Sequence, residues 1–124
     1  MIDRKKTEEM KARTKRFALR IIKVFRALPK TEEARIIGKQ LFRAGTSVAA
    51  NYRAVCRARS KADFISKIGV VVEETDESVF WLELLVDAEI VKKEKLSLLM
   101  KEGNELLAIF AASQITVRGY RQTK

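Results

Sequence analysis

The sequence contains no histidine, a single cysteine, a single proline and five glycines. Without histidine the chain lacks the commonest general base of enzymes and the commonest protein ligand of transition metals. The single cysteine, Cys56, excludes a disulfide within the chain and is typical of a reducing compartment. We therefore expect a cytoplasmic protein that is not an enzyme and that carries no metal or other cofactor.

Long hydrophobic runs are also missing. The longest uncharged run, residues 106–117, has twelve residues, whereas a helix needs about 20 to cross a bilayer. The apolar stretch near the N-terminus is interrupted by Arg20, Lys23 and Arg26, so it does not form the core of a signal peptide. We expect no membrane association, because the remaining apolar residues form stripes that suit a protein interior.

The shortage of glycine and proline, against abundant Ala, Leu, Lys, Arg and Glu, favours long helices. A chain of 124 residues is long enough for one domain with a core, and we take residues 1–124 as that domain. Apolar residues recur three and four positions apart, the spacing of an amphipathic helix. These stripes run from Phe17 to Leu28, Ala34 to Val55, Phe64 to Val86 and Leu96 to Ser113.

Helix starts are marked at two positions. Thr31 precedes two glutamates, and Ser60 is followed three residues later by Asp63, so each is a candidate N-cap. Short connections between four amphipathic helices predict an all-α, antiparallel up-down four-helix bundle. Outside the stripes we expect a basic N-terminal tail at residues 1–13, without fixed structure, and a basic C-terminal tail at 118–124.

The charge is strongly positive, +10 in total, and unevenly distributed along the chain. Residues 1–59 carry seventeen Lys and Arg against five Asp and Glu, and residues 90–124 carry seven against three. Residues 60–89 carry two against eight, so the third helix is acidic in a basic protein. Such an excess of cations favours an anionic partner, and nucleic acid comes first.

The antiparallel arrangement predicts where these cations gather. If helices two and three fold back near residue 59, Arg35 lies level with Glu83, and Arg43 lies within reach of Glu74. We expect these pairs to be ionic, with Arg43 partly buried. The remaining cations should converge on the end of the bundle near the second turn. The predicted nucleic-acid-binding residues are Arg53, Arg57, Arg59, Lys61, Lys11, Arg13, Lys15, Arg16, Arg118 and Arg121.

Other residues of the predicted helices suit packing or assembly. Gly38 and Gly45 form a shallow groove where another helix can approach closely, and the sequence leaves open whether that helix belongs to the same chain. Asn51, at a core-like step, suits a hydrogen bond that fixes register. Tyr52 and Trp81 suit core or subunit contacts better than base stacking. The carboxylates of the third helix suit a solvated or ion-paired face better than a cation site.

Residues 41–60 and 64–85 resemble the four-helix-bundle family of proteins encoded in intervening sequences of bacterial ribosomal RNA genes. A more distant similarity is to the accessory proteins of diversity-generating retroelements. The resemblance implies a small helical subunit that assembles into a ring, typically a pentamer. It also implies suspected nucleic-acid binding and no established enzymatic activity. Its most specific residues are Arg43, Ser47, Asn51, Tyr52, Phe64, Glu73, Glu74, Glu77 and Leu82.

Residues and resemblance together favour an oligomeric, non-enzymatic protein that binds nucleic acid through backbone phosphates with little sequence preference. RNA is favoured over DNA only because of the resemblance. The alternative is an oligomeric scaffold that binds a partner protein and has no direct role with nucleic acid.

Overall fold

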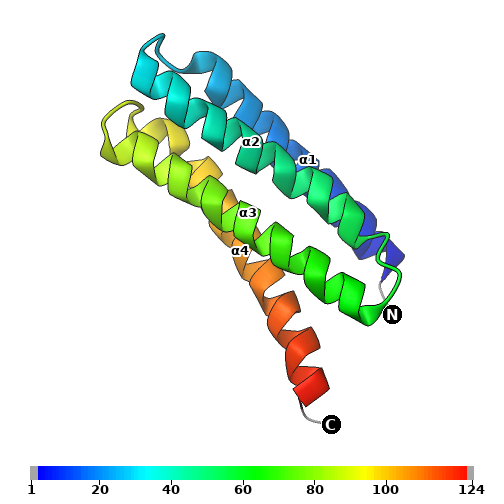
Figure 1. Ribbon diagram of the computed structural model, residues 1–124. Coiled ribbons are helices and arrows are strands. Elements are labelled where there is room, and N and C mark those ends of the chain that lie inside the picture. The colour runs from blue at the N-terminus through cyan, green and yellow to red at the C-terminus, as the bar shows by residue number, and fades with distance from the viewer. Residues whose placement is uncertain (1–2, 123–124) are drawn as a thin grey trace.

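The structure, a computed structural model, describes the backbone of residues 3–122 and the side chains of residues 3–118. Its four helices run up and down, each antiparallel to the one before it (Figure 1). The predicted all-α four-helix bundle is confirmed. In the described part of the chain, no helix combines the length and apolar character needed to cross a membrane. The helices are α1 (Arg4–Ala27), α2 (Glu32–Val55), α3 (Lys61–Asp87) and α4 (Lys93–Gln122).

Helix α1 begins much earlier than the sequence suggested. The Asp3 carboxylate caps it by accepting a hydrogen bond from the Lys5 N–H at 2.9 Å, and the side chain of Thr14 is fully buried. The expected unstructured tail is therefore wrong for residues 4–13. At the other end α4 continues to Gln122, so the predicted C-terminal tail begins inside a helix. The side chains of residues 119–124 lie outside the described part.

Both predicted N-caps are confirmed. The Thr31 hydroxyl accepts a hydrogen bond from the Ala34 N–H at 3.3 Å, and the Ser60 hydroxyl accepts one from the Asp63 N–H at 3.0 Å. The Asp63 carboxylate accepts from the Arg59 N–H at 3.0 Å, one residue before the cap. This reciprocal pair stabilises the start of α3 and holds the second turn in place.

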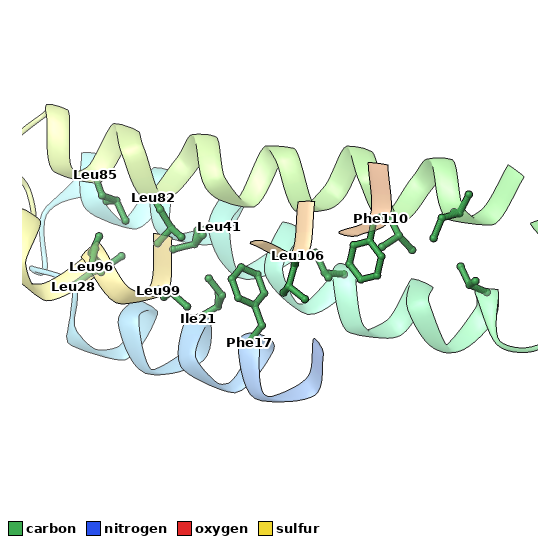
Figure 2. Packing of buried hydrophobic residues seen from close by; sticks show 14 of the residues in the cluster. Phe17, Ile21, Leu28, Leu41, Leu82, Leu85, Leu96, Leu99, Leu106 and Phe110 are labelled. Carbon is green, nitrogen blue, oxygen red and sulfur yellow. The ribbon is translucent and has the colours of Figure 1, made fainter. Parts of the chain in front are cut away.

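The core follows the predicted stripes. In Figure 2 the labelled side chains run from Leu28, Leu85 and Leu96 at one end of the bundle towards Phe110, and all belong to one buried cluster. Buried hydroxyls are satisfied within their own helices, as where Thr75 donates to the Val71 carbonyl at 2.7 Å. Among the described residues no buried side-chain nitrogen or oxygen lacks a hydrogen-bond partner.

The two glycines of α2 face α1 of the same chain. A Cβ placed on Gly45 would lie 2.7 Å from Ile21 Cγ1, and one on Gly38 would lie 2.5 Å from Leu28 Cδ1. Since α1 occupies the space that these side chains would need, the small-residue groove serves packing within the subunit. The question that the sequence left open is thereby answered.

Helices α2 and α3 are joined by ion pairs at mid-height. Arg43 Nη1 lies 3.3 Å from a Glu74 oxygen, as predicted, and Arg43 also contacts Glu77. The Arg43 side chain is 50% exposed, so the expectation that it is partly buried is wrong. Arg35 is exposed and forms no ion pair with Glu83 within the described residues.

Two predicted assembly residues of these helices make bonds within their own helix. The Asn51 amide donates to the Ser47 carbonyl at 2.9 Å and to the Ser47 hydroxyl at 2.7 Å. The Trp81 indole N–H donates to Glu77 at 3.2 Å while its ring packs edge-on against Phe80. A role for Asn51 and Trp81 in assembly stays a prediction.

Helices α1 and α4 meet over a short stretch. There Arg13 forms ion pairs with Glu102 and Glu105, and a Cβ on Gly103 would lie 3.4 Å from the Phe17 ring. Beyond this stretch the C-terminal half of α4 diverges from α1 and α2 (Figure 1). The bundle is consequently open at the end that holds the N-terminus and the second turn.

Candidate nucleic-acid interface

Arg53 and Arg57 stand at the C-terminal end of α2, where the chain turns towards α3. The turn is closed by hydrogen bonds from the Arg57 N–H to the Ala54 carbonyl at 3.1 Å and from the Ala58 N–H to the Val55 carbonyl at 3.0 Å. Both arginine side chains are exposed, and neither forms an ion pair with any described carboxylate. Their guanidinium groups are therefore available to an external anion.

On one side of the two arginines lies a cleft of about 280 Å³, which we call the α1–α2 cleft. Its carboxylate, Glu8, pairs with Lys11 at 2.9 Å, leaving an excess of positive charge in the cleft. The N-terminal turns of α1 and the C-terminal end of α2 thus contribute cations to one cleft. The lining residues are Arg4, Thr7, Glu8, Lys11, Arg53, Cys56 and Arg57.

On the other side lies a wider cleft of about 820 Å³, the α2–α3 cleft. Its carboxylate, Asp63, is bound by Lys67 Nζ at 2.9 Å, and this bond, with the Arg59 N–H, lowers the pKa of Asp63. The carboxylate is therefore ionised and held by its own neighbours. The charged lining residues are Arg53, Arg57, Arg59, Asp63 and Lys67.

Arg53 and Arg57 line both clefts and form the ridge between them. An arginine fork can bind a phosphate through two parallel hydrogen bonds, and it remains charged at any physiological pH. Two such forks one helical turn apart, with further cations on either side, suit a ligand that carries several phosphates in a row.

The structure brings together about half of the predicted binding residues. Lys11, Arg53 and Arg57 line the α1–α2 cleft, Arg59 lines the α2–α3 cleft, and Lys61 is exposed at the first position of α3. Sequence reasoning missed two cations of the clefts, Arg4 and Lys67. Arg4 could have been found from Asp3, a good N-cap residue, and from the spacing of Met10, Thr14 and Phe17, which extends the α1 stripe.

The other predicted residues lie elsewhere. Arg13 faces α4, is engaged by Glu102 and lines neither cleft, so the structure does not bring it to the other predicted residues. Lys15 and Arg16 are exposed farther along α1 and line neither cleft, because Lys11 is already level with Arg53. Arg118 is exposed on the diverging end of α4 and also lines neither cleft. The side chain of Arg121 lies outside the described residues.

Cys56, which lines the α1–α2 cleft, is partly buried. Burial raises the pKa of its thiol and outweighs the opposite effects of Tyr52 and Lys11, so neighbouring arginines do not activate it. Burial likewise raises the pKa of Tyr52 to about 12. Among the described residues, no group of three or more Cys, Asp and Glu side chains is arranged to hold a metal ion.

Comparison with known proteins places the chain in a family. No curated protein matches the sequence. A solved crystal structure with a TM-score of 0.78 and 31% sequence identity covers 84% of this chain and 96% of its own. That structure is of a protein of unknown function from the S23 ribosomal protein family of Bacteroides thetaiotaomicron. Residues 6–112 match the family described as 23S rRNA-intervening sequence protein, and the chain belongs to this family.

Proposed function

We propose that this protein is a non-enzymatic nucleic-acid-binding protein that holds backbone phosphates in the two clefts beside Arg53 and Arg57. The proposal rests on one observation above all. The two arginines line both clefts and have no ion pair with a described carboxylate, although glutamates bind Arg13 and Arg43 elsewhere on the surface. Cations that line a cleft and have no ion pair with the protein's own carboxylates can bind an external anion.

Phosphate contacts of this kind bring affinity and salt dependence but little sequence information. The family description, which refers to an intervening sequence of ribosomal RNA, favours RNA over DNA as the partner. The descriptions of the family and of the similar structure name no enzymatic activity. A protein that binds RNA without catalysing a reaction needs no general base, which agrees with the absence of histidine from this chain.

The test compares two double variants with equal loss of charge. Arg53→Gln with Arg57→Gln removes the ridge between the clefts, whereas Lys15→Gln with Arg16→Gln removes two exposed cations that line neither cleft. Binding of structured RNA is measured at several salt concentrations. We expect the first variant to weaken binding at least tenfold and to reduce the slope of log K against log salt by about 1.5, because each lost phosphate contact removes about 0.7 to 0.9. Equal effects of both variants would show that only total charge matters.

We also propose that the chain self-associates, with α3 as a contact surface, and the pentameric ring stays a prediction from the family resemblance. Phe80 is 49% exposed in the C-terminal third of α3 and packs edge-on against Trp81. It is flanked on the same exposed stripe by Asp76 and Glu83, which form no ion pair among the described residues. An exposed apolar side chain surrounded by carboxylates is complementary to a basic surface, and a second copy of this protein would offer such a surface.

In the alternative function, a scaffold, the α3 surface around Phe80 would bind a partner protein. Light scattering of the purified protein, before and after nuclease treatment, separates the two. We expect Phe80→Ser to reduce the particle mass, while Leu98→Ser, which alters a side chain that is 73% exposed on α4, leaves it unchanged. A mass that falls only after nuclease treatment would show assembly on nucleic acid and not through α3.

A further inference from the structure

The open end of the bundle contains an apolar groove, which we call the aromatic groove. It lies between the N-terminal half of α1 and the C-terminal half of α4 and has a volume of about 320 Å³. It is open because α4 diverges from α1 at this end (Figure 1). The residues that matter here are Lys6, Met10, Tyr52, Phe64, Ile109 and Phe110.

Three aromatic side chains line the groove. Tyr52 and Phe110 have ring centroids 5.6 Å apart with an interplanar angle of 34°, and Phe64 lines the same space. Phe110 is 2% exposed and belongs to the core, whereas Tyr52, Phe64 and Ile109 are partly buried against it. Tyr52, which the sequence assigned to core or subunit contacts, thus packs against the core but is not fully covered, and a partly exposed ring can stack on a base.

The aromatic groove and the α1–α2 cleft adjoin one another. Thr7 and Cys56 line both, Lys6 borders the groove, and Arg53 and Arg57 border the cleft on the other side of Cys56. A phosphate bound by these arginines would thus lie beside the entrance to an aromatic site. An aromatic groove next to a phosphate site matches the base and the phosphate of a nucleotide.

We propose that the aromatic groove takes an unpaired base of a single-stranded nucleic acid whose phosphates lie in the α1–α2 cleft. The inference rests on the proposed function and specifies the form of the nucleic acid. A volume of about 320 Å³ is at the small end of ligand pockets and suits one base rather than a stacked base pair. Single-stranded regions are also where bases are free to leave their own stack.

Base identity matters little in this site. The Thr7 hydroxyl donates to the Asp3 carbonyl at 2.9 Å, and the Ser113 hydroxyl donates to the Ile109 carbonyl at 3.1 Å. Both hydroxyl protons are engaged, and the Tyr52 hydroxyl is hydrogen-bonded with Cys56 and Thr7, so stacking dominates over hydrogen bonding to base edges. Stacking tolerates every base, which agrees with a binding site of low sequence preference.

The experiment compares two single-stranded oligonucleotides of about eight nucleotides, one with bases and one fully abasic, which carry the same phosphates. We expect the abasic strand to bind about tenfold more weakly with an unchanged salt slope. In the base-bearing strand, a 2-aminopurine should lose fluorescence on binding, as it does on stacking. Equal affinity for the two strands overturns the inference. If Arg53→Gln with Arg57→Gln still weakens binding in that case, the proposed function stands without it.

Two variants of Tyr52 supply the protein side of the test. Tyr52→Phe keeps the ring and should retain the difference between the strands, whereas Tyr52→Leu should reduce it. Helicity by circular dichroism controls for folding, and the strand comparison with the unaltered protein decides the matter if Tyr52→Leu unfolds. A change in particle mass with Tyr52→Leu, together with constant 2-aminopurine fluorescence, would assign the groove to a second copy of the chain and overturn the inference.

Discussion

Arg13 and Glu102 connect the first helix to the last through two hydrogen bonds of 2.8 Å, from Arg13 Nε to Oε2 and from Nη2 to Oε1. The two residues are 89 positions apart in the sequence. Their bond lies where α1 and α4 meet, just before α4 diverges, so it marks the edge of the open end. Arg13 raises the stability of the ionised Glu102 and lowers the pKa of that carboxyl.

We expect the Arg13–Glu102 pair to stabilise the fold by about 1 kcal/mol, more than an ordinary surface pair, because the contact is bidentate and both side chains are partly buried. A double-mutant cycle with Arg13→Ala and Glu102→Ala, followed by urea unfolding, measures this coupling. The cycle with Glu105→Ala is the internal control, since Glu105 offers one bond of 3.0 Å and is 51% exposed. Equal couplings for the two glutamates would contradict the expectation.

The same pair predicts a loss of stability in acid. The pKa of Glu102 is lower in the folded protein than its ordinary value of 4.5. The contribution is therefore present above that value and disappears as the pH falls through the folded pKa. Unfolding free energies measured between pH 6 and pH 3 should decline less steeply in Arg13→Ala than in the unaltered protein. Parallel pH profiles would show that Glu102 does not carry this effect.

Gly45→Ala should destabilise the protein by about 1 to 3 kcal/mol, because the added methyl group meets the branched side chain of Ile21. The added Cβ would lie 3.0 Å from Ile21 Cβ, an atom that can move away only if the Ile21 backbone moves. Gly69→Ala is the matched control in α3, where the nearest atom to a new Cβ is Gln114 Nε2 at 3.4 Å. There we expect a gain of up to about 1 kcal/mol from helix propensity. Thermal or urea unfolding distinguishes the two, and a gain at both positions would contradict the close approach of α1 and α2.

Ser60→Ala should cost about 1 kcal/mol, since it removes the acceptor for the Asp63 N–H at the start of α3. Ser66→Ala is a suitable control, because Ser66 is exposed within the same helix and alanine is the better helix former there. The turn beside Arg57 and Arg59 depends on this cap, so binding of RNA by Ser60→Ala should also weaken. A change in binding without any change in unfolding free energy would argue against a role through the cap.

Tyr52 should ionise only at about pH 12 while the protein is folded. Because burial raises the pKa above the ordinary tyrosine value of 10.0, the neutral phenol stabilises the fold below pH 10. That contribution is lost as the pH rises from about 10 to about 12. Absorbance of the phenolate in a Tyr120→Phe variant follows Tyr52 alone. A midpoint near pH 10 in the folded state would contradict the burial of the hydroxyl.

Much of the fold was predictable because helices depend on local spacing. The stripe from Ala34 to Val55 and the caps Thr31 and Ser60 were read correctly, since each involves residues a few positions apart. The start of α1 was missed because residues 4–13 are mostly charged, and Met10 is the one apolar side chain among them that is partly buried. The sequence placed Arg53, Arg57 and Arg59 together at the end of α2, as the structure does, but it also included cations that line neither cleft, and a nucleic-acid site there stays a prediction.

The sequence by itself determined that this protein is a helical bundle with acidic and basic helices, because periodicity, capping and charge are properties of short segments. Tertiary structure decided which cations remain available. Arg13 and Arg53 carry the same group, yet Arg13 meets Glu102 across the α1–α4 contact and Arg53 meets no described carboxylate. That difference depends on where α4 leaves α1, a result of packing between residues 89 positions apart, and no local pattern records it.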